Sequence, residues 1–164
     1  MVPSGSGEPV FSLHFYPYGP PWLKIYLSES VMKSYIEIPV RGYHLDMFSH
    51  VNNARYLEFL EEARWHALES SGFGFKELGN RGLAFAVVNI NINYRFPATV
   101  GDIITIDTSV ARMSKRSVTM SQTMTLKSDD RAVVDAEVTF VIMDAESGTA
   151  LELTDELKSV FIPN

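Results

Sequence analysis

Residues 53–71, NARYLEFLEEARWHALESS, contain neither glycine nor proline and consist mainly of residues with high helix propensity. Apolar residues recur here every three or four positions, which is the spacing of one helix face. These residues are Tyr56, Leu60, Ala63 and Ala67, and Leu57, Phe59 and Leu68 widen the face. Ser71 and Gly72 supply a stop signal. The pattern predicts one long helix that is buried over most of its circumference.

Five stretches instead alternate between apolar and polar residues, the pattern of strands with one buried face. They are residues 34–40, 88–96, 104–110, 118–126 and 134–142. The clearest is 88–96, VNININYRF, which Pro97 ends. Turn-forming residues in the short connections predict an antiparallel meander. Thr154, followed by Asp155 and Glu156, predicts a short C-terminal helix.

These elements define an α+β fold class. A sheet with one apolar face must bury that face, and an antiparallel sheet wrapped around one long central helix does so. We expect a single domain over residues 32–164. Residues 1–31 contain Ser4-Gly5-Ser6-Gly7 and several prolines, and differ in composition from the rest. We expect them to be an N-terminal extension, non-native or poorly structured, with Met32 as the natural start.

The composition excludes several kinds of protein. A net charge of −6 argues against a nucleic-acid partner, which requires clustered Lys and Arg. The absence of cysteine excludes disulfides and thiol nucleophiles, and is compatible with a cytoplasmic protein. No apolar run is long enough to span a bilayer. We expect no metal site, because His44 and His50 lack a third ligand in register. No G-x-S-x-G elbow of a serine hydrolase occurs.

The segment just before the helix carries the most specific motif. It reads DMFSHVNNARY over residues 46–56 and continues to EEAR at 61–64. This motif resembles the D-x-x-x-H-V-N-N-x-x-Y…E-x-A-R signature of hotdog-fold thioesterases related to 4-hydroxybenzoyl-CoA thioesterase. Residues 41–46 and 87–95 add a similarity to bacterial long-chain acyl-CoA thioesterases. The resemblance extends from about Ser34 to the C-terminal helix and implies a hotdog fold.

The resemblance implies hydrolysis of acyl-CoA to free acid and CoA, with no cofactor beyond the coenzyme A of the substrate. Asp46 would be the catalytic carboxylate, acting either as nucleophile or as general base for water. The Asn53 backbone N–H, at the positive end of the helix dipole, would polarise the thioester carbonyl. His50 would orient the loop or contact substrate, although a packing role is equally compatible. Asn52 is a candidate substrate contact or simply a helix cap.

Other residues are weaker candidates. Tyr56 belongs to the motif, and a set of polar and cationic residues could hold the phosphates of CoA: Arg95, Arg112, Lys115, Arg116 and Ser117. Apolar candidates for an acyl-chain wall are Met47, Phe59, Trp65, Phe73, Phe75 and Phe85. Asp46 taken alone is more typical of a turn residue. Glu61 and Glu62 are a second candidate carboxylate pair, but pairing with Arg55, Arg64 or a partner subunit is more typical.

Hotdog sheets have open edges, which proteins normally pair or cover. The resemblance implies a homodimer or homotetramer in which Asp46 of one chain lies near residues of another. Three alternatives to a long-chain acyl-CoA thioesterase stay open: an aryl-CoA thioesterase, an acyl-carrier-protein thioesterase, and a non-catalytic acyl-CoA-binding domain.

Overall fold

The computed structural model describes residues 31–162, so the predicted N-terminal extension lies outside the described residues except for Val31. The elements, in chain order, are β1 (Lys33–Pro39), the 3-10 turn η2 (Gly42–His44), α1 (Asn53–Ser70), α2 (Phe75–Asn80), β2 (Leu83–Tyr94), β3 (Ile103–Met113), β4 (Ser117–Leu126), β5 (Ala132–Asp144) and α3 (Asp155–Ser159). The five predicted strands, the long helix and the C-terminal helix are confirmed. The short elements η2 and α2 were not predicted.

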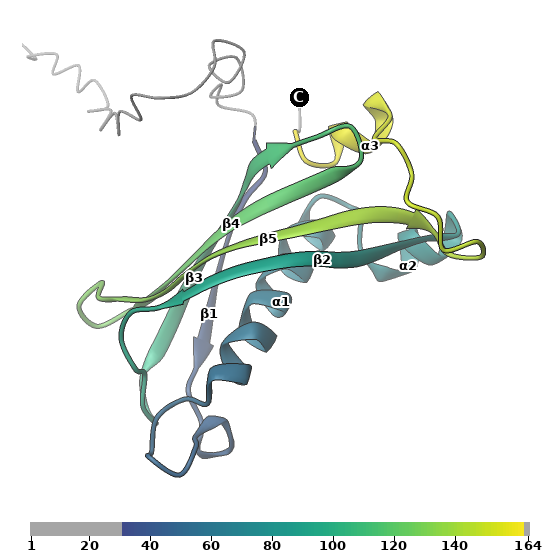
Figure 1. The fold of residues 1–164 in the computed structure, drawn as a ribbon. Coiled ribbons are helices and arrows are strands. Elements are labelled where there is room, and N and C mark those ends of the chain that lie inside the picture. Colours follow the sequence, from purple (N-terminus) through teal and green to yellow (C-terminus); the bar gives the residue numbers. More distant parts are fainter. Residues whose placement is uncertain (1–30, 163–164) are drawn as a thin grey trace, which may run out of the picture.

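The strands form one antiparallel sheet in the order β1-β3-β4-β5-β2, with α1 lying against one face (Figure 1). The predicted α+β fold is therefore confirmed. The predicted meander is correct only for β3, β4 and β5, because β2 pairs with β5 at the far edge. The connection from β2 to β3 is longer than a hairpin turn. It passes the start of α1, where buried Ala98 hydrogen-bonds to Val51 and to the Tyr56 hydroxyl.

The boundaries of β2 differ from the predicted 88–96. The strand begins at Leu83. The prediction began later because residues 83–87 are uniformly apolar and lack the alternation on which it depended. A β-bulge lies between Val87 and Asn89. It places both Val87 and Ile90 on the face toward α1, opposite the buried Phe140 and Val138 of β5. An inserted residue of this kind breaks the period of two on which the prediction depended.

The helix α1 is buried along one stripe and exposed elsewhere in the single chain. The buried side chains are Tyr56, Phe59, Leu60, Ala63, Arg64, Ala67 and Leu68. The predicted burial over most of the circumference is wrong for this chain, because the sheet covers one side of the helix. The helix packs more closely against β1 and β3 than against β2.

A polar network separates the two halves of the core. One apolar cluster surrounds the first half of α1 and another surrounds its second half. Between them, the buried Gln122 accepts a hydrogen bond from Arg64 Nη1 at 3.0 Å. The Gln122 amide donates to the Leu60 carbonyl at 2.9 Å and to Thr108 Oγ1 at 3.0 Å. Each polar group of Gln122 thus has a partner, as burial requires.

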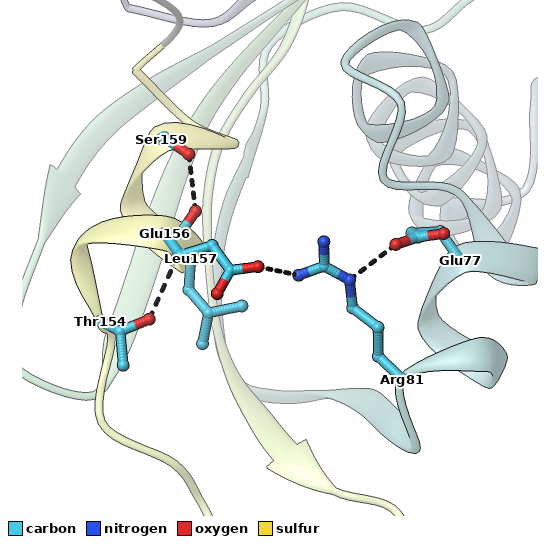
Figure 2. Close-up of polar contacts among 6 residues, drawn as sticks. All are labelled: Glu77, Arg81, Thr154, Glu156, Leu157 and Ser159. Atoms are coloured by element: carbon cyan, nitrogen blue, oxygen red, sulfur yellow. Dashed lines mark hydrogen bonds and ion pairs between the residues drawn. The ribbon is translucent and has the colours of Figure 1, made fainter.

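The C-terminal helix α3 closes one end of the core. Thr154 Oγ1 caps it by accepting a hydrogen bond from the Leu157 N–H, and Leu157 is buried. Arg81, which follows α2, bridges Glu77 at 2.6 Å and Glu156 at 2.8 Å (Figure 2). This bridge connects α2 to α3. All three side chains are substantially exposed, so we expect a small contribution to stability.

Within residues 31–162, no helix combines the length and hydrophobicity needed to cross a membrane. The same residues contain no group of three His, Cys, Asp or Glu side chains placed to hold a metal ion.

Candidate active site

The loop before α1 is a tight turn organised by Asp46. The Asp46 Oδ1 atom accepts hydrogen bonds from the Phe48 N–H at 2.8 Å and the His50 N–H at 3.3 Å. The Asp46 N–H donates to the His50 carbonyl at 2.8 Å. Ser49 adopts a φ of 63°, which tightens the turn. Asp46 is therefore a turn residue, but only one of its two carboxylate oxygens is used in the loop.

The first turn of α1 follows directly. Asn52 is the N-cap, because its Oδ1 accepts a hydrogen bond from the Ala54 N–H at 2.9 Å. The Asn52 N–H donates to the His44 carbonyl at 2.9 Å, which fixes the entry of the chain. Among the described residues, no acceptor is recorded for the Asn53 N–H. Such a first-turn N–H can bind an external oxygen at the positive end of the helix dipole.

An open pocket of about 440 Å³ lies beside this helix start. Its lining residues are Asp46, His50, Val51, Asn53, Tyr56, Tyr94, Arg95, Phe96 and Pro97. The fold thus brings together five of the residues predicted for the site, from the loop, from α1 and from the end of β2. Asp46 and Asn53 are thus neighbours at one pocket, and a carboxylate and a backbone N–H donor are the two kinds of group that hydrolysis of a thioester uses.

Two tyrosines build the pocket wall. The buried Tyr56 hydroxyl accepts a hydrogen bond from the Ala98 N–H at 3.0 Å, and burial raises the pKa of Tyr56. The Tyr94 hydroxyl donates to the Asn53 carbonyl at 3.2 Å. The ring centroids of Tyr56 and Tyr94 lie 5.7 Å apart. Tyr94 was not among the predicted site residues. The signals in the sequence were its place near the end of a strand, three residues before Pro97, and its position within the family-like stretch 87–95.

Arg95 lies at the rim of the pocket in an ion pair with Asp135. Its Nε contacts Asp135 Oδ1, and its Nη2 donates to Oδ2 at 3.1 Å. The hydrogen bonds from Arg95 lower the pKa of Asp135, and those to Asp135 raise the pKa of Arg95. Part of the charge that Arg95 would offer to a phosphate is therefore already neutralised.

The structure does not bring Lys115, Arg116 and Ser117 to this pocket within one chain. They lie at the turn between β3 and β4, where Lys115 pairs with Glu152 at 2.7 Å. Tyr94 of β2 and Met124 of β4 both pair with the same residue of β5, so Met124 lies at the same level along the strands as Tyr94. At about 3.3 Å per residue, Ser117 is roughly 23 Å from that level. A role for these three residues in binding CoA requires a partner subunit.

Two other expectations differ from the structure. Arg55 pairs with Glu58 at 2.7 Å and Arg64 bonds to Gln122, so the expected pairing of Glu61 or Glu62 with these arginines is wrong in the single chain. Arg112 pairs with Glu137, on the face of the sheet away from α1.

The predicted wall residues separate into three groups. Met47 and Phe75 are largely exposed, Phe59 and Phe73 are buried in the core, and Trp65 and Phe85 line a second pocket between α1 and β2. Glu61 lines that pocket too, away from Asn53.

The chain belongs to the thioesterase-like superfamily, whose family model matches residues 40–161. The matched region includes the loop, α1 and strands β2 to β5, and it begins just after β1. Fold, family and site thus define the chain as a hotdog-fold thioesterase.

Individual relatives agree with this assignment. The long-chain acyl-CoA thioesterase FadM of Escherichia coli is 50% identical over 122 residues, covering 74% of this chain and 92% of the relative. The crystal structure of YbaW, a probable thioesterase from Escherichia coli, superposes with a TM-score of 0.71 at 48% identity, covering 77% of this chain and 95% of that one. The chloroplastic acyl-acyl carrier protein thioesterase ATL2 of Arabidopsis thaliana is 28% identical over 66% of this chain and 58% of the relative.

Proposed function

We propose that this protein hydrolyses long-chain acyl-CoA to a free fatty acid and CoA in the pocket beside Asp46. The observation that carries the proposal is that Asp46 and Asn53, the first residue of α1, line the same pocket. The 50% identity to FadM supports the acyl-CoA substrate.

In this mechanism the thioester carbonyl oxygen accepts a hydrogen bond from the Asn53 N–H, which stabilises negative charge as the carbonyl carbon is attacked. Removing a donor of this type typically costs about 2.7–4 kcal/mol in the transition state. The Asp46 Oδ1 atom is held by the loop, so Oδ2 is the oxygen available for chemistry.

Two routes use the Oδ2 atom of Asp46. As nucleophile, it forms an acyl anhydride, releases the CoA thiolate, and is regenerated when water cleaves the anhydride. As general base, it takes a proton from water, and that water attacks the carbonyl carbon while the thiolate leaves. Both routes give one acid and one thiol for each water consumed.

We propose that the protein acts as a homodimer or homotetramer. The edge strand β2 has an unpaired side, and large apolar side chains on it are exposed, including Val88 at 57% and Ile90 at 39%. An exposed apolar edge of this kind is normally paired or covered. A second copy could also supply Lys115, Arg116 and Ser117 to the CoA phosphates, which one chain cannot do. Sedimentation of a monomer at micromolar concentration would contradict this.

The matched acyl-carrier-protein relative makes a carrier-protein substrate the second candidate. Carrier proteins are acidic, and the net charge of −6 disfavours their approach relative to free CoA esters. Parallel assays with the same acyl group on CoA and on a carrier protein separate the two substrates.

The decisive experiment is Asp46→Asn, assayed by thiol release from acyl-CoAs of 8 to 18 carbons. We expect kcat to fall about 100-fold or more, because a general base or nucleophile contributes at least that much. Asp107→Asn, on the outer face of β3, is the matched control and should keep the wild-type rate. Full activity in Asp46→Asn would refute the role of Asp46, and Glu61→Gln would then test the other candidate carboxylate.

A further inference from the structure

Tyr56 lines the Asp46 pocket and carries a hydroxyl that the mechanism has not used so far. The residue is 4% exposed, and its oxygen accepts a hydrogen bond from the Ala98 N–H at 3.0 Å. A phenol can accept one hydrogen bond and donate another. Over residues 31–162, no acceptor is recorded for the Tyr56 hydrogen. This buried hydroxyl is therefore a donor that can serve a ligand in the pocket.

The neighbouring Tyr94 hydroxyl differs in this respect. Its hydrogen goes to the Asn53 carbonyl at 3.2 Å, so Tyr94 holds the helix start and has no hydrogen left for a substrate. The ring centroids of Tyr56 and Tyr94 lie 5.7 Å apart, and both residues line the pocket. Of these two hydroxyls, Tyr56 is the one whose hydrogen a bound molecule can accept.

The helix directs the Tyr56 hydroxyl toward Asn53. Tyr56 follows Asn53 by three residues in α1, and long side chains on a helix lie back over the preceding turn, toward its N-terminus. The bond to Ala98 agrees with this direction, because the Ala98 carbonyl accepts from the Val51 N–H at 2.9 Å, just before the helix. The Tyr56 hydroxyl and the Asn53 N–H therefore belong to the same end of α1 and to the same pocket.

The surroundings of Tyr56 keep its hydroxyl protonated. Burial raises the pKa of Tyr56, and the charges of Asp102 and Asp46 raise it further, against the opposite effect of the Ala98 hydrogen bond. The phenol is therefore a neutral donor and not a base. The same two carboxylates disfavour negative charge on a substrate oxygen in the pocket. A second donor beside the Asn53 N–H would offset that repulsion.

We propose that the Tyr56 hydroxyl donates a hydrogen bond to the thioester carbonyl oxygen and, with the Asn53 N–H, forms a two-donor oxyanion hole. The inference rests on the proposed function and adds a catalytic residue to it. The bond strengthens as the carbonyl oxygen becomes negative, so it stabilises the transition state more than the bound substrate. Tyr56 keeps its proton in both routes through Asp46, and the proton of the released thiol comes from water.

The test is Tyr56→Phe, assayed by thiol release from one long-chain acyl-CoA. We expect kcat to fall about 100-fold with less than about a threefold change in KM, because the lost bond acts mainly in the transition state. Tyr35→Phe is the matched control and should keep the wild-type rate, since the Tyr35 hydroxyl bonds to Glu37 on β1. An unchanged kcat in Tyr56→Phe, with Asp46→Asn inactive, would overturn the role of Tyr56 and leave the proposed function standing.

A second variant separates the lost donor from a structural loss, because Tyr56→Phe also removes the acceptor of the Ala98 N–H. 3-Fluorotyrosine, introduced at position 56 alone, is a stronger donor and a weaker acceptor than tyrosine, since fluorine withdraws electron density from the phenol oxygen. At a pH where this phenol stays protonated, we expect kcat to equal or exceed that of the wild type. A kcat as low as that of Tyr56→Phe would assign the effect to the Ala98 bond and overturn the proposal.

A modified substrate tests which atom accepts the hydrogen bond. In an acyl-CoA whose carbonyl oxygen is replaced by sulfur, the acceptor is weak. The loss of kcat caused by Tyr56→Phe should then shrink from about 100-fold to less than about threefold. An undiminished loss would mean that Tyr56 acts on the water or on the leaving thiolate, and would overturn the oxyanion hole. A wild-type protein that hydrolyses no acyl-CoA would overturn both this inference and the proposed function.

Discussion

The Tyr94 hydroxyl donates a hydrogen bond to the Asn53 carbonyl oxygen across 3.2 Å and thereby connects the end of β2 to the first residue of α1. The residue held by Tyr94 is the one whose N–H is the proposed donor to the thioester. The sheet edge therefore fixes the position of that donor relative to Asp46.

Tyr94→Phe removes this hydrogen bond and leaves the ring in place. A hydrogen bond of this type contributes about 1 kcal/mol, so we expect kcat to fall about fivefold with little change in KM. Steady-state kinetics with one long-chain acyl-CoA measures this. Tyr35→Phe is the control, since the Tyr35 hydroxyl donates to Glu37 far from the pocket. Equal kinetics in both variants would show that the Tyr94 hydroxyl has no positioning role.

Asn52→Ala removes the N-cap of α1. Loss of a cap of this type costs about 0.5–2 kcal/mol, and we expect the free energy of unfolding in urea to fall by that amount. The catalytic rate should fall too, because the first turn carries Asn53. Asn52→Asp retains an oxygen acceptor for the Ala54 N–H and should keep most of the stability. If Asn52→Asp is as unstable as Asn52→Ala, the cap is not the cause.

His44 should make the stability depend on pH. Burial lowers the pKa of His44 below its usual 6.5, and its Nδ1 accepts a hydrogen bond from the Arg41 N–H at 3.0 Å. Below pH 6.5 the unfolded chain binds a proton that the folded chain resists, so the free energy of unfolding falls as the pH decreases. We expect a decrease in Tm from pH 7.5 to pH 5.

The pH effect has a simple control pair. His44→Gln retains a possible acceptor for Arg41 but cannot titrate, so its Tm should decrease less than that of the wild type over the same pH range. His66→Gln, at an exposed position of α1, should keep the wild-type decrease. Identical pH profiles for wild type and His44→Gln would contradict the assignment.

The sequence predicted the elements better than their pairing. Alternation over residues 104–110, 118–126 and 134–142 located three strands because each buries one face against α1. The pairing of β2 with β5 was missed, since it depends on the course of the chain around Ala98 rather than on any local pattern. The bulge at Val88 was missed for the same reason: it responds to the partner strand.

The candidate site shows the same contrast between residues that a local pattern identifies and residues that only tertiary packing brings together. Asp46, His50 and Asn53 belong to one contiguous motif, and the loop that they form places all three at one pocket. Tyr94 approaches Asn53 only through tertiary packing, so local sequence could not identify it. Lys115 and Arg116 were selected by charge alone, and charge does not reveal at which end of the sheet a turn lies.

The buried contact between Arg64 and Gln122 gives the last prediction. Gln122→Leu leaves the Arg64 guanidinium without its acceptor in a site that lowers the pKa of Arg64 through burial. We expect the free energy of unfolding to fall by about 3 kcal/mol, since hydrogen bonds to charged groups contribute about 1.5–3 and the unpaired group stays buried. Replacing both residues, as Arg64→Met with Gln122→Leu, removes the unpaired charge. Urea denaturation should therefore show the double variant to be more stable than Gln122→Leu alone, whereas strictly additive losses would mean that the two side chains are not coupled.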